Sequence, residues 1–150
     1  MSDKDPSMIA SNLSSGAQLF VFTMRQWCSA AHAKQCVHQR IQPFYDRFGA
    51  EQAASILDEM MCHITATAFR QVEVNCPCRL DLSEDELIVL NALRAIQQGD
   101  APLAGEKIST LLLGPFKTTF VRIADAYVHS LKDASLQLTG VRYLSLVPTP

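Results

Sequence analysis

The chain has 150 residues, of which 48% are apolar and 19% are charged, and its formal net charge is −2. An apolar fraction this large excludes a wholly disordered chain, and the length suits one domain that buries its own core. The balanced charge and the dispersed basic residues are unlike those of proteins that bind nucleic acid or an anionic membrane surface. We therefore expect neither nucleic acid nor membrane as a partner.

The start of the chain has no feature of a secreted or membrane-inserted protein. It opens with Asp3, Lys4 and Asp5, whereas a signal peptide opens with a basic stretch. The apolar run from Ala17 to Met24 is far shorter than the ~20 residues that a membrane-spanning helix needs. We expect a cytoplasmic protein in which the five cysteines, an odd number, are mostly reduced thiols.

The sequence predicts a loose polar tail over residues 1–13 and a single helical domain over residues 14–150. Apolar residues three and four positions apart indicate a first helix from Ser14 to about Ile41, ended by Pro43. Arg25 lies off the apolar stripe of that helix and is expected to face away from it. A second stripe indicates a helix from about Glu51 to Phe69.

From residue 71 to residue 82 the pattern changes from helical to alternating. Polar residues separate the apolar ones, which are Val72, Val74, Leu80 and Leu82. This alternation favours two short extended pieces on either side of Cys76-Pro77-Cys78, as a minor β-ribbon or as a plain loop. The tail from Leu136 to Val147 also alternates and is expected to add a strand.

The clearest helix start in the sequence is at Ser83. Ser83 and Glu86 have the spacing of a capping box, and Leu82 and Leu87 flank it as a hydrophobic staple. The helix that follows, over about residues 83–98, is apolar around most of its circumference. We expect it to be buried on more than one side and to form the centre of the bundle.

Two further helices complete the predicted fold. Gly99 ends the central helix, and a short fourth helix reaches about Leu113. A fifth helix begins at Pro115 and reaches about Ala134. The expected fold class is therefore mainly α, a single-domain bundle of about five helices around the helix at 83–98.

The least ordinary motif is the pair Cys76 and Cys78. Two thiols two positions apart on an extended chain point to one side, so both can reach one metal ion or react with an electrophile. A tetrahedral zinc site would need two more ligands, for which Cys62 and His63 are the nearest supply. The preferred interpretation leaves these four residues without metal, with Cys76 and Cys78 shaping a turn ahead of the capped helix.

Two other clusters are interpreted as structural. Cys28, His32 and Cys36 share one helix face, but the two cysteines would lie ~12 Å apart, too far for one metal ion. Asp125 and His129 are four residues apart on an outward helix face, and no nucleophile is identifiable beside them, so we expect a solvated ion pair.

The sequence therefore leaves two functions open. The preferred one is a non-enzymatic interaction or regulatory module that associates with itself, most simply as a homodimer. The alternative is a cysteine-centred protein that binds zinc or carries out thiol redox chemistry through Cys76 and Cys78, with Cys62 and His63 as further ligands.

Overall fold

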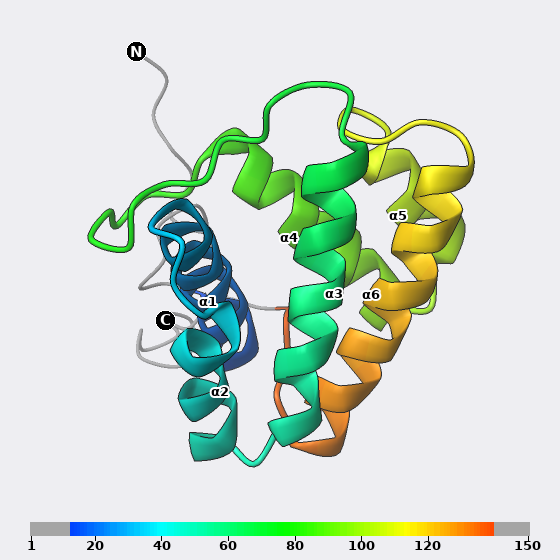
Figure 1. Ribbon diagram of the computed structural model, residues 1–150. Helices are drawn as coiled ribbons and strands as arrows, with labels where there is room; N and C mark the ends of the chain where they lie inside the picture. The colour runs from blue at the N-terminus through cyan, green and yellow to red at the C-terminus, as the bar shows by residue number, and fades with distance from the viewer. Residues whose placement is uncertain (1–12, 140–150) are drawn as a thin grey trace, which may run out of the picture.

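Six α-helices make up most of residues 13–139, the part of the chain that the computed structural model describes (Figure 1). They are α1 (Ser15–His32), α2 (Val37–Arg47), α3 (Glu51–Thr67), α4 (Glu84–Gln97), α5 (Ala101–Ile108) and α6 (Pro115–Asp133). Residues 13–139 contain no β-strand, so the chain is a mainly α single domain, as the sequence predicts. None of these helices combines the length and the apolar character needed to cross a membrane.

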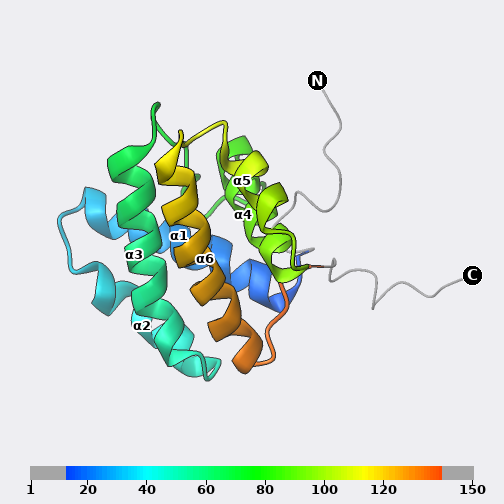
Figure 2. The same cartoon turned by 90° about the vertical axis from the view of Figure 1, so that its right-hand side faces the viewer.

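The helices pack as neighbouring pairs around a shared core. The helices α3 and α6 lie side by side in both views (Figures 1 and 2), while α2 packs against α1 and α3. The remaining pair, α4 and α5, closes the other side, where both helices contact α6. Residue 13, the last of the expected tail, is a fully buried leucine, and residues 1–12 lie outside the described part.

The first helix expected from the sequence is in fact two helices, which raises the count from five to six. The chain leaves α1 after His32, and Lys34 takes a left-handed conformation with φ of 59°. That conformation cannot continue a right-handed helix. The Gln35 amide closes the turn by donating to the Ala30 carbonyl at 2.8 Å, and α2 starts two residues later.

Pro43 lies inside α2 and does not end it, contrary to the expectation from the sequence. Proline lacks the amide hydrogen that would bond to the carbonyl four residues earlier, that of Gln39. Gln39 is exposed, so water can take over that bond. Ile41 and Tyr45 are fully buried and hold the helix against the core on both sides of the proline.

The helix α4 is as buried as its sequence predicts. No residue from Asp85 to Gln97 is exposed, and α4 packs against α1, α5 and α6. Its capping box is formed: the Ser83 hydroxyl accepts from the Glu86 amide at 3.0 Å, and the Glu86 carboxylate accepts from the Ser83 amide at 2.8 Å. This helix therefore provides a fixed support for the segment before it.

Residues 68–83 form a loop that passes from the end of α3 over α1 to the start of α4 (Figure 1). The β-ribbon considered for residues 71–82 is absent from this loop. Its amides at Glu73 and Asn75 donate instead to the carboxylates of Asp85 and Glu86 at 2.7 and 3.0 Å. These bonds to side chains replace the bonds that a partner strand would make.

The segment after α6 is tied to the starts and ends of other helices. Arg94 donates to the Leu138 carbonyl at 2.8 Å, and the Ser14 hydroxyl donates to the Gln137 carbonyl at 2.6 Å. No strand is formed up to Thr139, and the rest of the alternating tail, residues 140–150, lies outside the described part.

Candidate functional site

Cys76, Pro77, Cys78 and Arg79 form a tight turn at the exposed tip of the 68–83 loop. The Arg79 amide donates to the Cys76 carbonyl at 3.0 Å, which closes a β-turn with proline at its favoured second position. Cys76 and Cys78 are joined by a disulfide. Cys76, Pro77 and Cys78 are all exposed, so small molecules and other proteins can reach the sulfur atoms.

A buried ion pair between Arg25 on α1 and Glu86 on α4 lies beneath the turn. Arg25 Nε is 2.8 Å from Glu86 Oε2, and Arg25 Nη2 is 2.9 Å from Glu86 Oε1. The Arg25 side chain is 3% exposed and that of Glu86 is fully buried. Such a bidentate contact fixes both groups in one orientation, and it joins two helices that are far apart in sequence.

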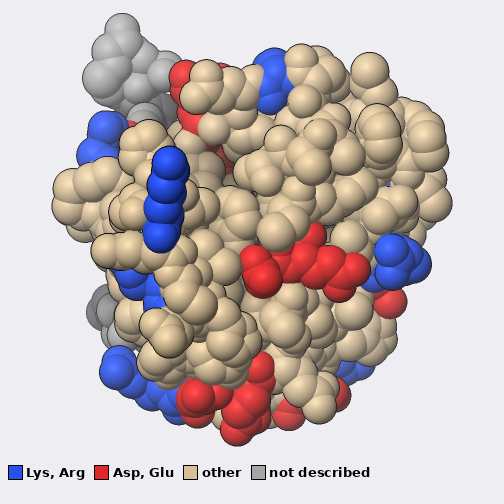
Figure 3. All heavy atoms as spheres, in the orientation of Figure 1, with Lys and Arg blue, Asp and Glu red and all other residues tan. Residues whose placement is uncertain are grey.

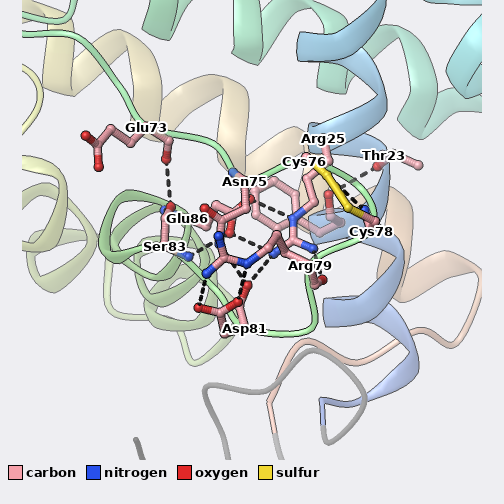
Figure 4. Close-up of polar contacts among 11 residues, drawn as sticks. Thr23, Arg25, Glu73, Asn75, Cys76, Cys78, Arg79, Asp81, Ser83 and Glu86 are labelled. Atoms are coloured by element: carbon pink, nitrogen blue, oxygen red, sulfur yellow. Dashed lines mark hydrogen bonds and ion pairs between the residues drawn. A yellow bond between two sulfur atoms is a disulfide. The ribbon is translucent and has the colours of Figure 1, made fainter. Parts of the chain in front are cut away.

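The same ion pair holds both flanks of the turn (Figure 4). Glu86 Oε2 accepts from the amide of Asn75, the residue before Cys76, at 3.0 Å. Arg25 Nη1 donates to the carbonyl of Arg79, the residue after Cys78, at 2.6 Å. Arg25 Nη2 also donates to the Asp81 carbonyl at 2.7 Å. Within residues 13–139 no buried side-chain nitrogen or oxygen atom lacks a hydrogen-bond partner, so these charges are fully satisfied.

A second ion pair holds the loop nearer to its start. Asp85, the residue before Glu86, accepts from two guanidinium nitrogens of Arg70 at 3.0 and 2.8 Å. Asp85 also accepts from the Glu73 amide at 2.7 Å. The hydrogen bonds from Arg70 hold the pKa of Asp85 below its ordinary value, although burial acts in the opposite direction. Arg70 is exposed, so solvent screens this pair more than it screens Arg25 and Glu86.

A shallow groove of about 250 Å³ adjoins the turn. Its walls include Val21 and Phe22 of α1 and, from the loop, Pro77 and Leu80. Phe22 and Leu80 are 36% and 69% exposed. Apolar surface therefore begins directly beside the two cysteines.

The other two candidate zinc ligands, Cys62 and His63, each contact an oxygen atom elsewhere in the bundle. Cys62 Sγ lies 3.7 Å from Asp58 Oδ1, and partial burial together with this carboxylate raises the pKa of Cys62. His63 Nε2 lies 2.8 Å from the carbonyl oxygen of Phe116. Among residues 13–139, no three His, Cys, Asp or Glu side chains are grouped so that they could hold a metal ion. The structure thus brings together Cys76 and Cys78 but does not add Cys62 and His63 to them.

The structure places Cys28 and Cys36, the two cysteines of the row with His32, in different environments. Cys28 is half-buried on α1, while Cys36 is exposed in the α1–α2 connection. Burial and then the charge of Glu86 raise the pKa of the Cys28 thiol to about 11. At neutral pH Cys28 is therefore a protonated and unreactive thiol.

Asp125 and His129 face solvent on α6. Their closest side-chain atoms are 3.6 Å apart, and both side chains are more than half exposed. They line a groove of about 370 Å³ together with Ile96, Gln97, Val128 and Lys132. His129 Nδ1 also lies 2.9 Å from the backbone carbonyl of Asp125, a contact within one helix turn that orients the ring along the surface.

Comparison of the chain with models of protein families, with curated proteins and with solved structures finds no match. Functional conclusions therefore depend on the geometry of the chain itself.

Proposed function

We propose that this protein is a thiol-redox regulatory protein of the cytoplasm, in which Cys76 and Cys78 pass between a dithiol and a disulfide. The observation that carries this proposal is the disulfide on an exposed turn whose flanks are fixed by buried charges. The cytoplasm keeps most thiols reduced, so disulfides there are usually transient and serve catalysis or redox sensing. A short exposed disulfide in that compartment fits a sensor better than it fits a structural cross-link.

The chemistry needs only a small disulfide as oxidant. One protein thiolate attacks a sulfur of the small disulfide, forms a mixed disulfide and releases one small thiol. The second protein thiolate then attacks the protein sulfur of that mixed disulfide and releases the other small thiol. Two electrons and two protons leave the protein, and the reverse sequence, starting from two small thiols, restores the dithiol.

Titration with glutathione tests this proposal. The full chain is equilibrated at a series of ratios of glutathione to glutathione disulfide, its free thiols are alkylated, and the modified cysteines are identified by mass spectrometry. We expect Cys76 and Cys78 to lose and regain alkylation together, with the same midpoint in both directions. A Cys36→Ser variant, which removes an exposed free thiol elsewhere, should leave the midpoint unchanged. Stoichiometric zinc that blocks alkylation of Cys62, Cys76 and Cys78 alike would favour the zinc-binding alternative.

A second candidate function, a self-associating interaction module, is favoured by an apolar surface at the opposite edge of the bundle. This apolar end consists of Phe69, Leu113 and Phe116, which are 51%, 59% and 43% exposed. The Phe69 amide bonds to the Leu111 carbonyl at 3.0 Å, and the Phe116 amide bonds to the Leu113 carbonyl at 3.0 Å. These bonds bring the loop after α3 beside the α5–α6 connection. The surface over the upper parts of α3 and α6 is almost entirely uncharged (Figure 3).

Self-association predicts a concentration-dependent molar mass. Light scattering over micromolar concentrations should show a homodimer that dissociates on dilution, because two-fold pairing is the simplest way to cover such a surface. Combined Phe69→Ser and Leu113→Ser substitutions should weaken the dimer. Phe48→Ser changes an apolar residue with similar exposure, 45%, outside the apolar end and should have no effect. A strict monomer at all concentrations would contradict this second function.

A further inference from the structure

We infer that the buried Arg25–Glu86 pair is the positioning pair of Cys76 and Cys78 and sets how readily the two thiols oxidise; this inference rests on the proposed thiol-redox function. Within residues 13–139, neither side chain forms a hydrogen bond with a sulfur atom of the turn. Both act through the backbone, because they bind the residues on either side of the turn.

The Arg25–Glu86 pair holds the turn at both ends. The Asn75 amide reaches Glu86 at 3.0 Å, and the Arg79 carbonyl reaches Arg25 at 2.6 Å. Only Cys76, Pro77 and Cys78 lie between these two anchors. The proline ring fixes one more dihedral angle of this short span. Few conformations therefore remain for the two thiols to lose when they join.

The buried pair should stay in place in either oxidation state of the two cysteines. Its bonds to the capping box are made to Ser83 on the helix side, away from the turn. The side chains of the pair are 3% and 0% exposed, so separating them would leave each charge buried without its opposite charge, which is strongly unfavourable. The anchors should therefore persist in the dithiol, and the two thiols stay near each other.

The equilibrium constant for oxidation of the two thiols by glutathione disulfide measures the effect of the anchors. One dithiol and one glutathione disulfide give one protein disulfide and two glutathione molecules, so sulfur, protons and electrons balance. Holding the thiols together before reaction lowers the entropy that ring closure loses. Loss of the anchors should therefore shift the equilibrium toward the dithiol.

The chain provides a matched control in the neighbouring ion pair. Asp85 and Glu86 are consecutive residues of α4, each accepts two bonds from an arginine, and each accepts an amide of the loop ahead of the turn. Glu86 also accepts the Ser83 amide in the capping box. Asp85 binds the amide of Glu73, three residues before Cys76, and so does not hold the turn itself. Glu86→Gln and Asp85→Asn both change a carboxylate to an amide, and only the first affects an anchor of the turn.

The test measures the glutathione equilibrium constant of the full chain and of both variants. We expect Glu86→Gln to lower the constant for disulfide formation about tenfold, which raises the reduction potential by about 30 mV. Asp85→Asn should stay within about twofold of the wild type. Arg25→Lys, which keeps the charge but loses the planar fork, should shift the potential in the same direction as Glu86→Gln. Equal potentials for Glu86→Gln and Asp85→Asn would overturn the inference and leave the redox function standing.

A second measurement needs no variant and covers the case in which Glu86→Gln does not fold. Hydrogen exchange is followed at the Asn75 amide of the wild-type protein before and after reduction. Persistent protection in the dithiol supports anchors that precede oxidation. Loss of protection on reduction would show that the disulfide orders the turn, and would overturn the inference. If the wild-type cysteines do not cycle in glutathione buffers at all, the proposed redox function and this inference both fail.

Discussion

Three hydroxyl groups in the core, those of Thr23, Tyr45 and Tyr127, form a directed chain of hydrogen bonds. The Thr23 hydroxyl donates its only hydrogen to the Leu19 carbonyl at 2.7 Å, so it accepts from Tyr45 across 2.6 Å. Tyr45 has then used its own hydrogen and accepts from Tyr127 across 2.7 Å. Burial raises the pKa of both phenols, which keeps them protonated donors. These hydrogen bonds join the helices α1, α2 and α6.

The direction of these hydrogen bonds predicts that Tyr→Phe substitutions at positions 45 and 127 lower the free energy of unfolding by different amounts. Tyr45→Phe removes the middle of the chain and leaves the buried Tyr127 hydroxyl without an acceptor, so it should cost about 1–3 kcal/mol of unfolding free energy. Tyr127→Phe removes only the last donor and should cost about 0.5–1.5 kcal/mol. Urea denaturation measures both. The double variant should cost less than the sum, because its two losses share one bond. A larger effect of Tyr127→Phe would reverse the assigned direction.

The lowered pKa of Asp85 predicts how the free energy of unfolding changes in acid. Its pKa is lowered in the folded protein, first by the hydrogen bonds from Arg70, so the charged form stabilises the fold. That stabilisation is present above the unfolded pKa, about 3.9, and is lost as the pH falls through the lower folded pKa. The urea midpoints of wild type and Asp85→Asn should therefore differ near neutral pH and converge in acid. Equal urea midpoints of the two proteins near neutral pH would contradict this role of the Asp85 charge.

Arg25 and Glu86 illustrate which residue-scale features can be predicted from a sequence. The bond between Ser83 and Glu86 spans three residues, so a local pattern reveals it. The bond between Arg25 and Glu86 spans 61 residues, and no local pattern encodes it. Arg25 was expected to face away from the apolar stripe, yet it is buried, because the 68–83 loop covers that side of α1. The sequence offers one hint of further partners for these acids. Three consecutive acids begin α4, and the capping box uses only Glu86.

At the scale of elements, glycine and proline predict some helix boundaries, whereas Pro43 lies inside α2, and tertiary contacts decide the others. Gly99 and Pro115 mark the end of α4 and the start of α6 within a few residues. The break after His32 has neither glycine nor proline, so the apolar pattern alone continued the helix through it. Residues 71–82 alternate in polarity, which favours extended pieces, but the amides of Glu73 and Asn75 bond to carboxylates on α4 in place of a partner strand.

Two glycines give a matched test of how the segment after α6 packs. A Cβ at Gly16 of α1 would overlap the Gln137 carbonyl group, whereas a Cβ at Gly105 of α5 would meet nothing within 4 Å. Gly105→Ala should raise the unfolding free energy by about 0.5–1 kcal/mol, because alanine loses less entropy in a helix. Gly16→Ala should lower it by about 1–3 kcal/mol, because the backbone of the segment must move. Stabilisation by both substitutions would show that residues 136–139 do not pack against α1.

At the scale of the whole molecule, the Cys76–Cys78 turn and the core are separate parts. The core is built by side chains of all six helices, among them Phe20, Tyr45, Leu57, Leu93, Ile108 and Phe120. The Cys76–Cys78 turn contributes no buried side chain and is attached to the core through Arg25 and Glu86. A change of oxidation state can therefore alter the surface of the loop while the bundle stays folded, which the proposed redox function requires.

This separation predicts that the fold tolerates removal of both cysteines of the turn. Combined Cys76→Ser and Cys78→Ser substitutions open a disulfide that closes only a very short loop, and such a bond restricts the unfolded chain little, by about 1–2 kcal/mol. The Arg25–Glu86 pair remains in place and keeps the flanks of the turn attached. We expect an unchanged helical far-UV spectrum and one cooperative urea transition, with the unfolding free energy lower by no more than that amount. Chemical reduction of the wild type should give the same result. Collapse of the helical spectrum, together with release of zinc from the wild-type protein, would instead make the cysteines structural and favour the metal-binding alternative.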